Sequence, residues 1–299
     1  MLYKNLSGYL REKYGKRLKK ICIDAGFSCP NRDGKISTGG CIFCGERGAG
    51  EHINPLLSIK EQVSFALENS DESEEFIAYF QNFTNTYADI DTLKSRYDAA
   101  LVSDRIKVLA IGTRPDCIDE KVAALLASYQ EKRDVWVELG LQTASDETAK
   151  IINRGYSLEC FENAVSLLEK HGLKTVVHLI IGLPGETLED VKKTSAYISK
   201  IKLFGVKIHS IYVMRGTRLE KEYNEGRYTA PTLEEYSEGA AYILSHLSPD
   251  VIIHRLTGDC PDGLLIAPEW NKDKHAVIRK IEEKLASERK RQGSDFQLN

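Results

Sequence analysis

Runs of apolar and often β-branched residues recur along the chain and predict its strands. They span residues 19–24, 76–82, 106–112, 134–140, 173–182, 205–213 and 250–256. Most of these runs are apolar throughout, without polar alternation, which is typical of a sheet that helices cover on at least one side. The pattern therefore predicts a largely buried sheet.

Amphipathic stretches with helical spacing fall between the strands. We expect helices near 58–69, 91–103, 119–131, 158–171, 187–202, 232–247 and 273–288. Asp119 and Thr187 are suitable N-caps, and Gly172 is a suitable helix end. About six alternations of strand and helix indicate parallel βα units of an α/β fold, either barrel-like or doubly wound.

The composition indicates a globular chain without a targeting segment. Of the 299 residues, 42% are hydrophobic and 28% are charged, as in soluble domains with a core. No signal peptide opens the sequence, and no apolar run approaches the ~18 residues of a membrane span. We therefore expect a cytoplasmic protein without a membrane partner, whose seven cysteines are thiols, metal ligands or redox groups.

Charge is distributed unevenly along the chain. The net charge of −3 argues against a chain that binds nucleic acid over its whole surface. However, residues 1–50 carry ten Lys and Arg against four Asp and Glu. The excess lies around the start of the first predicted strand, at Lys16, Arg17, Lys19 and Lys20. It indicates either a solvated helix face or a contact for phosphates.

Four of the seven cysteines cluster in one loop region, at Cys22, Cys29, Cys41 and Cys44. The region follows the first predicted strand, where parallel α/β folds place ligand-binding loops. Four thiolates could bind one zinc ion. Three thiolates could instead bind three irons of a [4Fe–4S] cluster and leave the fourth iron open.

The position of Cys22 favours the cluster, because this residue lies inside the apolar run of the strand. Four unligated thiols are a third alternative. The other cysteines, Cys117, Cys160 and Cys260, are scattered, and we expect them to be free thiols.

An ordered set of segments resembles a known family. The segments are GFSCPNRDG, GGCIFC, QNFTNTYA, GTRPDC, ELGLQT, INRGY, HLIIGLPGET, KIHSIYVMRGTRL and RLTGDCP. Together they resemble the radical S-adenosylmethionine (SAM) superfamily, in the branch that includes the catalytic subunit of Elongator. The resemblance is greatest to a small bacterial subfamily with a CPNRDG…GGCxFC loop, and it spans about residues 18 to 285.

The resemblance implies a fold and its division. The expected fold is a partial (β/α)6 TIM-like barrel with a C-terminal strand and helix extension. Residues 1–17 would form a basic N-terminal segment, 18–215 the radical SAM core, 216–288 the extension packed on the core, and 289–299 a tail.

The resemblance also implies the site. Cys29, Cys41 and Cys44 would hold a [4Fe–4S] cluster, although their spacing departs from the commonest Cys-x3-Cys-x2-Cys pattern. SAM would lie beside the cluster. The residues at positions that contact SAM in relatives are Gln81, Asn82, Glu138, Gln142, Arg154 and His178; no residue is assigned a catalytic role.

Each of these side chains also has a structural interpretation. Arg154 could cap a helix, Gln142 could be a satisfied core amide, and His178 and His209 could be core histidines. Four later residues could face a substrate or form ion pairs: Lys207, Arg215, Arg255 and Asp259.

The function that the resemblance implies is reductive cleavage of SAM to a 5′-deoxyadenosyl radical. The implied substrate is tRNA, at the 5-substituent of the wobble uridine in the aminomethyl branch, with a flavodoxin- or ferredoxin-type electron donor. The alternatives are a radical SAM enzyme that acts on a small molecule or peptide, and a non-catalytic zinc-binding protein that requires Cys22. The oligomeric state is not indicated.

Overall fold

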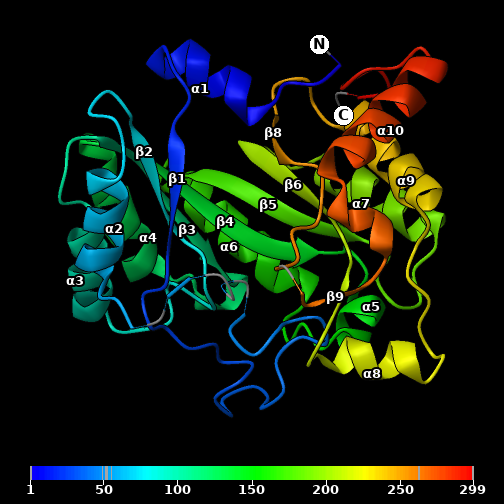
Figure 1. The fold of residues 1–299 in the computed structure, drawn as a ribbon, viewed down its shortest axis with the longest axis horizontal. Helices are drawn as coiled ribbons and strands as arrows, with labels where there is room; N and C mark the ends of the chain where they lie inside the picture. The colour runs from blue at the N-terminus through cyan, green and yellow to red at the C-terminus, as the bar shows by residue number, and fades with distance from the viewer. Residues whose placement is uncertain (1, 49, 51–52, 55, 262, 298–299) are drawn as a thin grey trace.

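A computed structural model describes residues 2–48, 50, 53–54, 56–261 and 263–297. Within these residues seven parallel strands form one curled sheet, in which each strand neighbours the next along the chain (Figure 1). They are β1 (Lys19–Ile23), β2 (Phe76–Phe80), β3 (Ile106–Thr113), β4 (Asp134–Gln142), β5 (Lys174–Ile181), β6 (Gly205–Ser210) and β8 (Ile252–Arg255). Because β1 and β8 are the two edges, the sheet is a half-barrel, which confirms the predicted partial barrel.

Helices cover the outer side of the half-barrel (Figure 1). They are α2 (Ile59–Glu68), α3 (Ile90–Ala100), α4 (Glu120–Ser128), α6 (Leu158–Lys170), α7 (Leu188–Ile198), α9 (Leu233–His246) and α10 (Lys274–Ser287). Capping boxes begin α2 at Ser58 and α9 at Thr232, as the Ser/Thr-x-x-Glu pattern dictates. Among the described residues, no helix has the length and apolarity needed to cross a membrane.

Alternation along the strands separates two cores. On β4, Val135 and Val137 face outward and pack in the large core beneath the helices, whereas Trp136 faces the lumen. The lumen is filled at the amino ends of the strands by a second cluster. Its members are Leu10, Leu18, Ile77, Tyr79, Val108, Ala110, Trp136 and Val176.

Helix α1 (Leu6–Tyr14) supplies Leu10 to this lumen cluster, and the strand pattern did not predict it. Asn5 caps α1 by accepting a hydrogen bond from the Gly8 N–H at 2.8 Å. Figure 1 shows α1 at the opposite end of the sheet from the loop that follows β1. Side chains therefore close the lumen at its amino end, and space for a ligand remains only toward its carboxyl end among the described residues.

The strand predicted at 205–213 is two strands. β6 ends at Ser210, and Val213–Met214 forms β7, which pairs antiparallel with β9 (Leu265–Ala267) in a separate ribbon. The apolar run continues past the break because Ile211 and Val213 leave the sheet for a third apolar cluster beside Leu183. The short helices α5 (Asp146–Ile151) and α8 (Arg218–Asn224) also escaped prediction.

Candidate functional site

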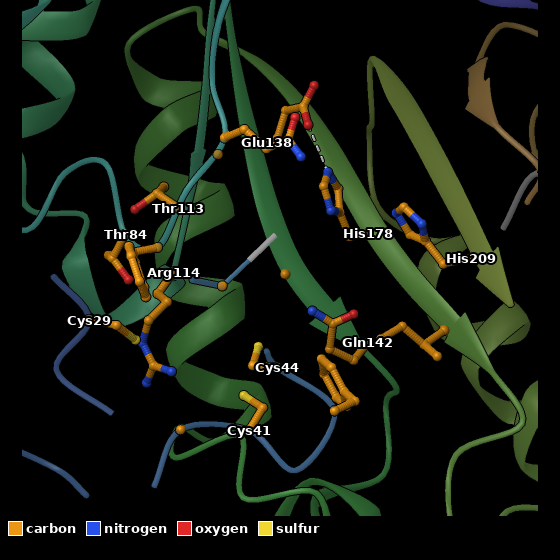
Figure 2. Close-up of a pocket in the computed structure, with 18 of the residues that line it drawn as sticks. Cys29, Cys41, Cys44, Thr84, Thr113, Arg114, Glu138, Gln142, His178 and His209 are labelled. Atoms are coloured by element: carbon orange, nitrogen blue, oxygen red, sulfur yellow. Dashed lines mark hydrogen bonds and ion pairs between the residues drawn. The ribbon is translucent and has the colours of Figure 1, made fainter. Parts of the chain in front are cut away.

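A cavity of about 250 Å³ lies in the lumen at the carboxyl ends of the strands. The loop after β1 contributes Cys29, Arg32, Cys41 and Cys44 to its walls. The strands and the loops that follow them contribute Tyr79, Gln81, Thr84, Thr113, Arg114, Glu138, Gln142, His178, His209 and Tyr212. Figure 2 shows Cys29, Cys41 and Cys44 near one end of this cavity and Glu138 near the other.

The cysteine loop is fixed by its polar residues. The fully buried Asn31 donates from Nδ2 to the Asn153 carbonyl at 2.7 Å, and the same nitrogen lies 3.8 Å from the Cys41 sulfur. Asn153 in turn donates to the Gly40 carbonyl at 2.7 Å. These reciprocal bonds tie the loop after β1 to the segment after α5, which sets the position of Cys41.

The thiols lie in a positively charged environment. The Cys41 thiol donates a hydrogen bond toward Cys44, which lowers the pKa of Cys44 to about 7 and raises that of Cys41. The guanidinium groups of Arg32 and Arg114 lower the pKa of Cys44 further. Arg32 is held against the loop by a bond of 3.1 Å to the Cys44 carbonyl. These surroundings favour the thiolate of Cys44, the form of cysteine that binds metals.

Cys22 is separated from the other loop cysteines. It lies on β1 opposite Tyr79 and lines a second cavity, so a site made of all four thiols is not assembled. Among the described residues, no three His, Cys, Asp or Glu side chains converge as ligands of one metal ion. A cluster distributes its thiolates over separate irons and does not require that convergence.

A buried charged group occupies the opposite end of the cavity. Glu138 and Lys207 form an ion pair, and their side chains are 2% and 3% exposed. His178 Nε2 lies 2.8 Å from the same carboxylate, and Lys207 also donates to the Tyr79 hydroxyl at 3.2 Å. Burial alone would raise the pKa of Glu138, but Lys207 and His178 hold it well below its usual range. Burial lowers the pKa of His178, which disfavours the imidazolium form even beside the carboxylate.

A bulge at the end of β4 turns Gln142 into the cavity. The pairing of β4 with β5 shifts register between Gly140 and Gln142, and Gln142 takes a left-handed φ of 67°. Its Oε1 is buried without a hydrogen-bond partner, and so is the Oγ1 of Thr84 across the cavity. Two orphaned oxygens in one cavity are available to a bound ligand.

Two predicted site residues do not line the cavity. Asn82 is 1% exposed and donates to Asp24 at 2.6 Å. Arg154 is also 1% exposed, and its guanidinium donates to the Leu141 and Thr143 carbonyls, both at 2.8 Å. These bonds bridge the end of β4 to the following loop, so Arg154 shapes the backbone around Gln142.

Arg114 is the guanidinium that does line the cavity, and it was not among the site residues predicted from the sequence. It pairs with Asp116 at 2.7 Å and donates to the Arg154 carbonyl at 2.9 Å. Arg114 and Arg154 both stack on Tyr156, each 4.8 Å from the ring centroid. The signal available was its place in GTRPDC, directly after β3.

Two models of known protein families match this chain. Residues 33–198 match the Radical SAM superfamily, and residues 204–287 match the Radical SAM C-terminal domain. The Bacillus subtilis protein YtqA is 35% identical over 99% of this chain and 93% of its own length.

A sequence relative and a solved structure from Methanocaldococcus infernus show a more distant similarity. The tRNA uridine(34) acetyltransferase of Methanocaldococcus infernus is 32% identical over 58% of this chain, and the match spans 33% of that enzyme. The solved structure of M. infernus Elp3, with an N-terminal deletion, superposes with a TM-score of 0.65 at 21% identity. That superposition covers 89% of this chain and 63% of the other, and it supports the half-barrel fold.

Proposed function

This chain belongs to the radical SAM superfamily, and we propose that it modifies tRNA, maturing the 5-substituent of the wobble uridine in the aminomethyl branch. Enzymes of this family use a [4Fe–4S] cluster and SAM. The chemistry that these groups supply is reductive cleavage of SAM to a 5′-deoxyadenosyl radical, which abstracts hydrogen from an unactivated C–H bond. The radical chemistry in this proposal is supported by the three loop thiols, which share one cavity with the orphaned oxygens.

The donor set of the cavity fits both groups. Cys29, Cys41 and Cys44 supply three thiols, and Arg32 and Arg114 beside them favour the thiolate of Cys44. Three thiolate ligands would leave one iron of a bound cluster without a protein ligand, which SAM could then bind. We assign the cluster to these three residues and a free thiol to Cys22.

The polar walls fit SAM. Gln142 and Thr84 offer unpartnered oxygens that can accept hydrogen bonds from ribose hydroxyls or an ammonium group. Gln81 lines the same wall. Arg154 and Asn82 support this wall from behind, so we assign them positioning roles in SAM binding. Glu138 and His178 lie at the far end, where they would meet the adenosine or the substrate.

Support for tRNA comes from the relatives. The similarity to the M. infernus tRNA uridine(34) acetyltransferase covers 58% of the residues of this chain. Uridine 34 is the wobble position that we propose for this chain. A flavodoxin- or ferredoxin-type protein would be the electron donor.

The first test is iron and acid-labile sulfide in anaerobically reconstituted protein, with zinc measured alongside. We expect about four irons and four sulfides per chain. Cys41→Ala should lose them, whereas Cys22→Ala, the matched control in the other cavity, should retain them. One zinc without sulfide, lost in Cys22→Ala, would contradict the cluster and favour the zinc-binding alternative.

The second test concerns the substrate. Nucleosides of total tRNA are compared by mass spectrometry between cells with the gene, without it, and with the Cys41→Ala gene. In cells without the gene and in cells with the Cys41→Ala gene, we expect a wobble uridine whose 5-substituent is not fully matured. Unchanged tRNA nucleosides, together with an intact cluster and SAM cleavage, would favour the small-molecule or peptide alternative.

A further inference from the structure

A second cavity, of about 830 Å³, adjoins the first. It opens between the two edges of the half-barrel, with Cys22 from β1 on one side and Arg255 from β8 on the other. The two cavities share walls made by Tyr79, Gln81, His178, His209 and Tyr212. A molecule in the second cavity therefore lies beside the contents of the first.

The lining of this second cavity is strongly cationic. It includes four basic side chains, Lys20, Lys207, Arg255 and Lys274, and the carboxylate of Asp259. Asp259 Oδ2 lies 3.3 Å from Arg255, and Asp259 also bonds Lys274. Lys207 pairs with Glu138, which lies on the side of the first cavity. Cations therefore outnumber the carboxylates that face them.

The cations are arranged from rim to floor. Lys20 is exposed, and its Nζ lies 4.8 Å from the centre of the Tyr79 ring. Lys207 approaches the same ring, with Nζ at 4.4 Å, from the fully buried side. Arg255 and Lys274, whose side chains are 32% and 50% exposed, occupy the β8 side. An entering group would pass the rim cations before it reached Lys207.

Mutual repulsion among these cations is already present. Burial lowers the pKa of Lys207 to about 7 despite its bond to Glu138, and the charges of Lys20 and Arg255 lower it further. The same three cations act on Cys22, where they oppose the rise in pKa that burial causes. An anion in the cavity would relieve this repulsion, which is unscreened where Lys207 is buried.

We propose that the second cavity binds an anionic oxygen group of the substrate, either a carboxylate on the modified base or a phosphate of its backbone. This assignment rests on the proposed function for the identity of the substrate, but not for the presence of an anion site. The charge surplus, the buried Lys207 and the shared wall with the first cavity carry it. Ammonium and guanidinium groups bind either oxygen group by charge-assisted hydrogen bonds.

Inorganic phosphate tests the anion site without any RNA. Calorimetric titration compares cluster-loaded wild-type protein with Lys20→Gln, Arg255→Gln and Lys121→Gln. Lys121 is exposed on α4 outside the barrel and serves as the matched control. We expect Lys20→Gln and Arg255→Gln each to weaken phosphate binding about tenfold, with Lys121→Gln unchanged. Equal affinity in all four proteins overturns the proposal, and unchanged iron content shows that the variants fold.

RNA then distinguishes the two sources of the anion. Two anticodon stem-loops are used, one with uridine and one with 5-carboxymethylaminomethyluridine, a carboxylated nucleoside of the aminomethyl branch, at the wobble position. If the anion is on the base, the carboxylated loop binds more tightly, and Arg255→Gln abolishes the difference. If the anion is a phosphate, Arg255→Gln weakens the binding of both stem-loops equally. It also reduces the slope of log affinity against log salt concentration by about 0.7–0.9. RNA affinity that Arg255→Gln leaves unchanged overturns the assignment to substrate. Phosphate binding with no RNA affinity at all would contradict the tRNA function while the anion site stands.

Discussion

The two ends of the lumen are built by the same strands but differ in chemistry. On β4, Trp136 and Glu138 face the lumen two residues apart; Trp136 packs in the apolar amino-end cluster, and Glu138 forms the buried ion pair. On β5, Val176 and His178 repeat this arrangement. One step along each strand therefore changes the lumen from apolar packing to a charged, hydrogen-bonded site.

The difference separates stability from function. Apolar side chains at the amino end lose water on folding and need no partners. At the carboxyl end, the desolvation of Glu138 and Lys207 opposes folding, and their mutual attraction must offset it. A buried ion pair is weak evidence for stability, so its position on the cavity wall indicates a functional reason for keeping it.

The largest effect should come from emptying the amino end. Trp136→Ala removes a 1%-exposed indole and should lower the free energy of unfolding by about 3–5 kcal/mol. Anaerobic urea titration measures this loss, and Trp136→Phe is the control that keeps most of the packing. A loss below about 1 kcal/mol would show that the lumen cluster contributes little to the stability of the protein.

The next effect should come from breaking the ion pair at the carboxyl end. Glu138→Gln leaves Lys207 buried without its carboxylate and should cost about 3 kcal/mol near pH 6–7. Glu138→Gln/Lys207→Met should recover most of the stability, because an uncharged pair of similar volume has no buried charge to desolvate. A double variant as unstable as the single one would contradict this account.

The Glu138–Lys207 pair should also make the free energy of unfolding depend on pH. The pKa of Lys207 is about 7 in the folded protein and near 10.5 when unfolded. Between these values the unfolded chain binds more protons, so the contribution of Lys207 to stability rises as pH increases from about 7 to 10.5. Wild-type protein should show this slope in urea titrations, and Lys207→Met should lack it. Equal slopes in the two proteins would contradict the lowered pKa.

The sequence predicted elements better than side-chain directions. Continuous apolar runs located the seven strands of the sheet, because burial on the outer face is recorded directly in the pattern. The apolar run at 205–213 did not indicate where β6 ends, because Ile211 and Val213 are as buried outside the sheet as they would be inside it. Hydrophobicity alone does not say which core a residue joins.

The site was predicted in part. The cysteine loop could be found from spacing and segment order, and the structure brings Cys29, Cys41 and Cys44 to one cavity. In contrast, Arg114 follows the end of β3 and Arg154 follows α5, and the sequence alone does not say which guanidinium faces the cavity. Which one faces the cavity depends on the loop after β4, whose carbonyls capture Arg154. Lys207 joins Glu138 only through the curl of the sheet, across 69 residues.

A smaller effect should follow from the loss of a single polar group in the carboxyl-end cavity. Gln142→Ala removes an unpartnered amide oxygen and should weaken SAM binding about tenfold, with little change in stability. Equilibrium dialysis of SAM with cluster-loaded protein measures the affinity. Arg154→Gln should instead lower stability, because it breaks buried hydrogen bonds to carbonyls. Unchanged SAM affinity in Gln142→Ala would remove this residue from the SAM site.

The smallest effect concerns the outer surface of the amino end, and it tests whether that end serves only stability. Lys19 pairs with Glu74, so its charge is partly neutralised. Lys16 and Arg17 are exposed beside α1. If they contact tRNA, Lys16→Gln/Arg17→Gln should flatten the dependence of log affinity on log salt by about 1–2 and leave SAM binding unchanged. Filter binding at several salt concentrations measures this slope, with Lys121→Gln as control. An unchanged slope would show that Lys16 and Arg17 make no phosphate contacts and would argue against RNA binding at the amino end.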